Sequence, residues 1–122
     1  MPKRLHTVIA TRTFEISAKS AGIKDGEVDS LVTLLAANPL AGDLVPGTGG
    51  ARKVRLAAKG RGKRGSYRTY HYFGGDDVPV FLLAAFAKNE KSDLSSSEKE
   101  ALRSLLSHLA SDYRENRRRT GR

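Results

Sequence analysis

The residues best placed to do chemistry form a basic block in the middle of the chain. Residues 45–75 contain no aspartate or glutamate, and their eight positive charges nearly equal the net charge of +9. These charges belong to Arg52, Lys53, Arg55, Lys59, Arg61, Lys63, Arg64 and Arg68. Because like charges on a folded surface repel one another, the block predicts a polyanionic partner, with nucleic acid first and an acidic protein second.

Tyrosines accompany these charges. In an extended "SYRTYHYF" (residues 66–73), Arg68, Tyr70 and Tyr72 share one face, and in "ARKVRLA" Lys53 and Arg55 also share one. Cations that hold phosphates beside rings that stack on bases are typical of single-strand binding. The predicted RNA contacts are Lys59, Arg61, Lys63, Arg64, Tyr70, Tyr72 and Lys91. A solvated sheet face with packed tyrosines is the structural alternative.

The same residue types could also cut RNA, because RNA carries its own nucleophile. A 2′-hydroxyl can attack the adjacent phosphate if a base removes its proton, cations stabilise the phosphorane and an acid protonates the leaving oxygen. Lysine and arginine could do this without a metal or cofactor if crowding by like charge lowers the pKa of one lysine. Composition leaves binding and cutting both open.

Other chemistries find little support. The chain has no cysteine, and His6, His71 and His108 are scattered without metal-ligand spacing. "PGTGG" lacks the Gly-Lys-Ser/Thr ending of a phosphate-binding loop, and the acids of "GDD" are typical of a turn. We therefore expect neither a metal nor a cofactor.

The first half of the chain predicts one strand and two helices. "LHTVIATRTF" (residues 5–14) is rich in β-branched residues and predicts a strand, followed by a short helical piece that ends at Gly22. A second helix is predicted by an apolar stripe at i, i+3, i+4 and i+7. The stripe consists of Val28, Leu31, Val32 and Leu35. Residues 38–50 are predicted to form a loop.

The second half predicts three strands and a helix. Residues 51–57 and 66–73 alternate, whereas "VPVFLLAAF" (residues 78–86) is continuously apolar, as in a central strand. "FGGDD" between the last two is typical of a hairpin turn. The C-terminal segment offers capping boxes at Ser95 with Glu98 and at Ser97 with Glu100. An apolar stripe follows, made of Leu102, Leu105, Leu106, Leu109 and Tyr113.

These elements predict one α+β domain over residues 1–122, with a largely antiparallel sheet. Two N-terminal helices should cover one face, a C-terminal helix should follow, and residues 115–122 should form a frayed basic tail. The longest apolar run, residues 78–87, is about half the roughly 20 residues of a membrane-spanning helix. The N-terminus lacks the apolar core of a signal peptide, so we expect a cytoplasmic protein that does not bind membranes.

Three motifs give the chain a family resemblance. "GTGG-(x)-RK-(x)-R" (residues 47–55), "GKRG-(x)2-R" (residues 62–68) and "AKNEKSDLS" (residues 87–95) occur in order with suitable spacing. In these motifs the chain resembles the RelE/HigB family of bacterial type II toxins, especially the HigB-like branch with a long "KGRGKRG" loop. The resemblance implies a microbial-ribonuclease-like fold, cleavage of mRNA in the ribosomal A site, and contacts with rRNA. It also implies a cognate antitoxin, often one with a helix-turn-helix domain.

The resemblance also implies roles for individual residues. Lys53 and Arg55 match the paired basic residues that orient RNA or transfer protons, and Arg68 matches the arginine that stabilises the transition-state phosphate. Lys88 lies in the basic motif after the last core strand. These four are the predicted catalytic residues.

Two positions depart from the family pattern. Asn89 stands where studied RelE enzymes have an arginine, and Ser95, interpreted here as a helix cap, stands where they have a catalytic tyrosine. The candidates for the role of that tyrosine are Tyr70, Lys91, Lys63 and Arg64. Two other functions stay open: binding to DNA gyrase without RNA cleavage, as in the ParE branch, and plain nucleic-acid binding.

Overall fold

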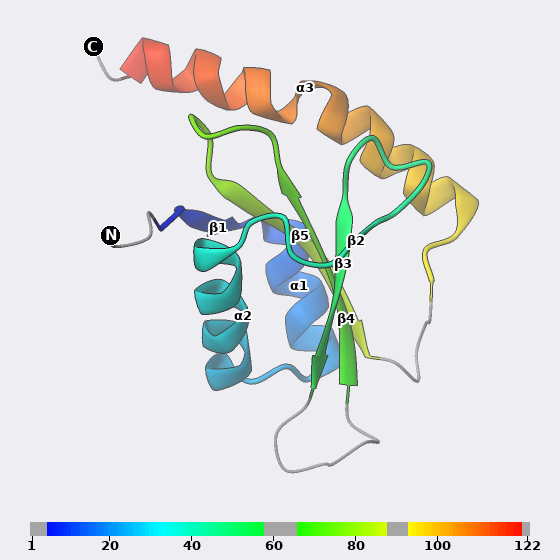
Figure 1. Ribbon diagram of the computed structural model, residues 1–122. Coiled ribbons are helices and arrows are strands. Elements are labelled where there is room, and N and C mark those ends of the chain that lie inside the picture. Colours follow the sequence, from blue (N-terminus) through cyan, green and yellow to red (C-terminus); the bar gives the residue numbers. More distant parts are fainter. Residues whose placement is uncertain (1–4, 58–65, 88–92, 121–122) are drawn as a thin grey trace.

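The computed structural model describes residues 5–57, 66–87 and 93–120, with side chains described up to residue 117. Within these residues, three helices and a five-stranded sheet form an α+β fold (Figure 1). The strand order is β1-β5-β4-β3-β2, and only β1 runs parallel to its neighbour. The predicted fold class and largely antiparallel sheet are therefore confirmed.

The N-terminal strand is shorter than the sequence predicts. β1 spans Val8–Ala10, and α1 begins directly after it at Arg12–Ala21. The Thr11 hydroxyl accepts a hydrogen bond from the Phe14 backbone amide at 3.1 Å, which caps the helix. The strand prediction is thus wrong for residues 5–7, which lie outside β1, and for residues 11–14, where the cap begins a helix in spite of the β-branched composition. The predicted helix end at Gly22 is confirmed, since Gly22 has the left-handed φ of 81° of a C-cap.

The second helix matches the sequence prediction, whereas the segment after it matches only in part. α2 spans Asp25–Ala37, and its predicted stripe faces the core, with Leu31 and Leu35 fully buried. A two-residue strand, β2 (Asp43–Leu44), lies in the segment that was predicted to be a loop. It pairs with the first two residues of β3 and forms the sheet edge.

Three strands form the body of the sheet. β3 spans Arg52–Ala57, β4 spans Ser66–Phe73 and β5 spans Val80–Ala87. β4 and β5 are antiparallel and joined by the predicted turn. Val80–Ala85 is buried between β1 and β4, which confirms the central position that its continuous apolar run predicts.

The two faces of the sheet carry separate cores. On one face, α1 and α2 contribute Phe14, Ala18, Leu31 and Leu35 to a cluster that includes Val80 and Leu82 of β5. The other face holds the second cluster, whose buried members are Ala51, Tyr70, Phe81, Leu83, Ala84, Leu94 and Leu106. The last of these comes from the C-terminal helix.

That helix, α3 (Ser96–Thr120), crosses the end of the sheet toward the side of β1 (Figure 1). The predicted Ser95 capping box is present: Ser95 N donates to Glu98 Oε1 at 2.7 Å, and Glu98 N donates to Ser95 Oγ at 3.2 Å. The second predicted box is wrong, because Ser97 lies inside the helix. α3 includes residues 115–120 of the predicted tail, and fraying there stays a prediction. No helix within the described segments is long and apolar enough to cross a membrane.

Candidate nucleic-acid interface

Three predicted basic residues lie on one face of the β3–β4 hairpin. In the antiparallel register, Arg55 is paired with Arg68, and Lys53 is paired with Tyr70. Directly paired residues project to the same side of a sheet, with Cβ atoms about 5 Å apart. The structure therefore brings Lys53, Arg55 and Arg68 together on the face that α3 covers farther along, and we call these three residues the basic patch.

The arginines of the basic patch lack protein partners in the part of the chain that the structure describes. Arg55 is exposed and Arg68 is half-buried, and neither has a hydrogen bond or ion pair with another described residue. Asp77, an acidic residue of the β4–β5 turn, binds Arg114 and not Arg68. Like charges directly opposite one another destabilise a sheet, so this pair costs stability within the described part of the chain.

Not every base of the block faces this side. Arg52 Nη1 donates to the backbone carbonyls of Leu40 and Gly42, each at 3.0 Å, and so holds the loop before β2. Arg52 is paired with buried His71, on the side of the sheet that α1 and α2 cover. The structure assigns this arginine a structural role.

An acidic residue that the sequence interpretation missed joins the basic patch. Lys53 Nζ lies 3.2 Å from Asp93 Oδ1, in the segment before α3. The Lys53 side chain is 31% exposed and that of Asp93 is 72% exposed. The two residues are 40 positions apart, so no local sequence pattern could have predicted this contact.

Tyr70 requires a correction. Its side chain is only 1% exposed and packs edge-on against Phe86, with ring centroids 6.2 Å apart. The prediction that Tyr70 stacks on a base is therefore wrong, because α3 and the segment before it bury the ring in the second core. The Tyr70 hydroxyl is buried without a hydrogen-bond partner. Burial and the nearby Asp93 and Glu98 raise its pKa, against the opposing effect of Arg68, so the phenol stays neutral.

Tyr72 lies farther from the basic patch than its alternation suggested. The half-buried ring packs against the second core cluster and sits between Gly50 and Gly74. A Cβ atom at either glycine would lie 3.1 Å from the ring, which is tight packing for a side chain. RNA contact by Tyr72 stays a prediction. Of the two tyrosines predicted to contact RNA, only Tyr72 remains a candidate.

Six predicted site residues lie outside the described residues. These are Lys59, Arg61, Lys63 and Arg64 between β3 and β4, and Lys88 and Lys91 after β5. Arg55 and Arg68 lie near the ends of the strands that lead into and out of the first of these segments. Roles for all six stay predictions.

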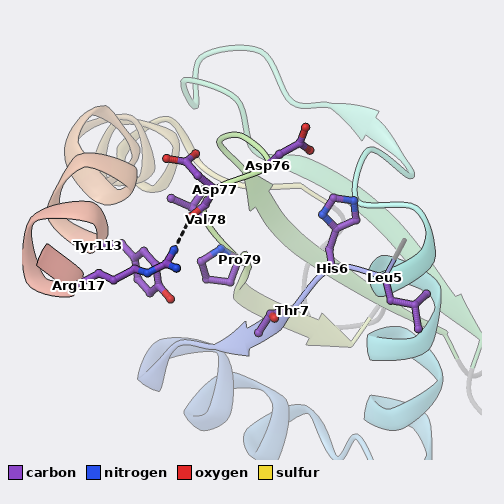
Figure 2. A pocket seen from close by; sticks show the side chains of 9 residues that line it. All are labelled: Leu5, His6, Thr7, Asp76, Asp77, Val78, Pro79, Tyr113 and Arg117. Atoms are coloured by element: carbon purple, nitrogen blue, oxygen red, sulfur yellow. Dashed lines mark hydrogen bonds between the residues drawn. The ribbon is translucent and has the colours of Figure 1, made fainter. Parts of the chain in front are cut away.

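A cavity of about 650 Å³ lies at the other end of β4, next to the β4–β5 turn (Figure 2). It is lined by Leu5, His6, Thr7, Asp76, Asp77, Val78, Pro79, Tyr113 and Arg117. Arg117 Nη1 donates to the Asp77 carbonyl at 3.4 Å, and Arg114 forms two hydrogen bonds to the Asp77 carboxylate. Because Arg114 and Arg117 of α3 both bind Asp77 of the β4–β5 turn here, we interpret this region as a structural joint between α3 and the sheet.

No group of three or more potential metal ligands occurs among the described histidines, aspartates and glutamates.

Comparisons with known proteins place this geometry in context. A family model described as "RelE toxin of RelE / RelB toxin-antitoxin system" matches residues 6–119. Among solved structures, the chain is similar to that of a double arginine mutant of the E. coli toxin RelE in the free state. That match has a TM-score of 0.50 and 12% sequence identity, and it covers 72% of this chain and 88% of that chain. At this identity, the structural likeness concerns the fold.

Proposed function

The chain belongs to the RelE toxin family, and from that premise we propose that it is a ribosome-dependent endoribonuclease that cleaves mRNA during translation. The observation that carries the proposal is the Arg55–Arg68 pair: two arginines at directly opposite positions of β3 and β4, neither with a partner among the described residues. An RNA phosphate carries one negative charge in the ground state and close to two in the phosphorane-like transition state, so two arginines match the transition state better.

In the proposed reaction, the 2′-hydroxyl attacks the adjacent phosphorus and the bond to the 5′-oxygen breaks. The planar guanidinium of Arg68 holds two non-bridging phosphate oxygens at once. Arg55, on the neighbouring strand, holds the RNA on the other side of that phosphate. Charge stabilisation of this kind comes from side chains, so the proposal calls for no metal. Lys53 lies on the same face of the sheet.

Ser95 stands at the position where studied RelE enzymes have a catalytic tyrosine, and its hydrogen bonds indicate a different role. The Ser95 hydroxyl accepts from Glu98 N and contacts Ser97 Oγ at 3.2 Å. A hydroxyl engaged in capping α3 is poorly placed for proton transfer. The proposed enzyme must therefore obtain its acid and base elsewhere.

The proposal includes a setting for the activity. A cognate antitoxin, with a helix-turn-helix domain, would neutralise the toxin, and the substrate would be mRNA held on the ribosome with contacts to rRNA. Both partners imply action in the cytoplasm. The family description, which names a toxin–antitoxin system, supports the antitoxin part.

Mapping new 5′ ends on a reporter mRNA after brief expression tests the proposal. We expect cuts inside the translated region that disappear when the start codon is removed, and no cuts with Arg68→Ala. DNA breaks with intact mRNA would overturn the proposal in favour of a gyrase-directed toxin. Binding to nucleic acid with neither effect would favour a non-catalytic module.

A further inference from the structure

The position of Asp93 beside the basic patch lacks a structural explanation. Its bond to Lys53 joins two solvent-accessible side chains, and exposed ion pairs of this kind contribute little to stability. The cap of α3 is formed by Ser95 and Glu98 without Asp93. A carboxylate also weakens the attraction of the patch for RNA phosphates, so its presence needs another reason.

Several charges act at the place where Asp93 lies. Lys53 approaches it from β3. The charges of Asp93, Arg68 and Glu98 all act on the Tyr70 hydroxyl on β4, since each changes the pKa of that group. Lys53, which is bonded to Asp93, is paired with Tyr70, and Arg68 lies two residues before Tyr70 on the same face of β4. A phosphate held by Arg68 would bring its flanking oxygens toward the Lys53–Asp93 pair.

We propose that Asp93 and Lys53 are the base and the acid of RNA cleavage; this inference rests on the proposed endoribonuclease function. The Asp93 carboxylate accepts the proton of the 2′-hydroxyl as the 2′-oxygen bonds to phosphorus. The phosphorus–5′-oxygen bond breaks, and the Lys53 ammonium gives a proton to the departing 5′-oxygen. The products are a 2′,3′-cyclic phosphate and a 5′-hydroxyl.

The contact between the two residues also resets them. After cleavage, Asp93 carries a proton and Lys53 lacks one. Because Nζ and Oδ1 are 3.2 Å apart, the proton can pass from Asp93 to Lys53 along their hydrogen bond. No outside proton donor or acceptor is required, and the pair returns to its starting charges.

The alternative is that Asp93 only competes with RNA for Lys53, as an internal substitute for a phosphate. The two explanations predict opposite results for Asp93→Asn, which removes the charge and keeps the shape. Loss of a base slows cleavage by about 100-fold or more, whereas loss of a competitor tightens RNA binding and leaves cleavage as fast or faster.

The test measures single-turnover cleavage of mRNA on programmed ribosomes by wild type, Asp93→Asn and Asp76→Asn. Asp76 is an exposed aspartate in the distant β4–β5 turn, so its variant matches the change in net charge. We expect a slow Asp93→Asn enzyme, an unaffected Asp76→Asn enzyme and equal melting temperatures. Cleavage by Asp93→Asn at or above the wild-type rate would overturn the inference.

A modified substrate separates the base from the acid. When sulfur replaces the departing 5′-oxygen, it leaves as a thiolate and needs no proton. Lys53→Gln, slow on normal RNA, should regain most of its rate on this substrate, whereas Asp93→Asn should stay slow. Rescue of Asp93→Asn would contradict its role as the base. If the wild type itself leaves mRNA intact on the ribosome, the proposed function fails, and the inference fails with it.

Discussion

Arg68 and Arg114 show two different uses of the same side chain. Arg114 on α3 binds the Asp77 carboxylate through Nε at 2.5 Å and Nη2 at 2.8 Å. Arg68 faces Arg55 across the hairpin and has no described partner. A matched arginine fixes one element to another, whereas an unmatched arginine facing a second positive charge costs stability and is best explained by a ligand. On this ground we distinguish the structural joint, which contains Arg114, from the basic patch, which contains Arg68.

The largest effect is expected at the unmatched arginine. Arg68→Ala should slow cleavage on the ribosome by about 100- to 1000-fold, because it removes a preorganised contact to developing charge. Arg68→Lys should recover only part of the rate, since lysine offers a point charge in place of a planar fork. Single-turnover kinetics measure both rates.

Thermal melts of the same variants serve as the control for Arg68. The melting temperature should stay close to that of the wild type, because Arg68 makes no described bond. Near wild-type cleavage by Arg68→Ala would contradict the assignment of the site. A large loss of stability would show that Arg68 belongs with the structural arginines.

The next effect concerns the charges of the connecting segment between β3 and β4. Neutralising Lys59, Arg61, Lys63 and Arg64 together should reduce the slope of log affinity for single-stranded RNA against log salt by roughly 3, at about 0.7 for each phosphate contact. Filter binding at about 50 to 200 mM salt measures the slope. The control variant neutralises Arg12 and Lys19 on α1, on the opposite side of the sheet. This change should leave the salt slope nearly unchanged. An unaltered slope in the fourfold variant would remove this segment from the interface.

A smaller effect is expected on the side of the sheet that α1 and α2 cover, where buried His71 makes the stability of the protein sensitive to acid. Burial lowers the pKa of His71 from 6.5 to about 4, and nearby Arg52 acts in the same direction, against a hydrogen bond to the Pro39 carbonyl. That carbonyl can only accept, so His71 Nε2 carries the proton at 3.1 Å. The other ring nitrogen, Nδ1, is buried without a partner.

Because His71 binds a proton more tightly when the chain is unfolded, protonation favours unfolding. The stabilisation is complete above about pH 6.5 and is lost as the pH falls toward 4, so unfolding should cost roughly 2 kcal/mol less at pH 5 than at pH 7. Denaturant titrations at both values measure the change. His71→Gln should remove most of this dependence, and His108→Gln, at an exposed histidine of α3, should retain it. Equal pH dependence in both variants would contradict the assignment.

The smallest effect is expected at the matched arginine. Arg114→Ala should lower the melting temperature slightly and leave cleavage unchanged, because surface ion pairs contribute little. Its hydrogen bonds hold the pKa of Asp77 below its ordinary value. The small stabilisation is therefore present above the pKa of an unfolded aspartate and is lost as the pH falls. Melting curves near pH 7 and pH 3 test this, and a strong loss of cleavage would contradict the separation of the two regions.

Local patterns were sufficient to predict much of the fold. The apolar run of β5, the stripe of α2 and the Ser95 capping box each depend on neighbouring residues, and each is present. The first strand was predicted too long, because composition favoured β-structure where a single Thr11 hydroxyl begins a helix. β2 has only two residues and depends on its pairing with β3, which the sequence of residues 43–44 does not reveal.

The site was predictable only where strand alternation determines it. Alternation correctly grouped Lys53 with Arg55, and the hairpin brought Arg68 opposite them. It could not reveal that Tyr70 is buried, because residues after β5 and on α3 supply its cover. Nor could it reveal Asp93, whose contact with Lys53 depends on the path of the chain into α3.

The most direct test of the central claim compares one mRNA in two states with purified wild-type protein. Single-turnover cleavage is measured on the mRNA positioned in the ribosomal A site and on the same mRNA free in solution. We expect rapid cleavage on the ribosome and very slow cleavage of free RNA, because the basic patch is open and the ribosome must hold the reacting phosphate in line. Intact mRNA on the ribosome, or equally fast cleavage of free RNA, would contradict the proposal.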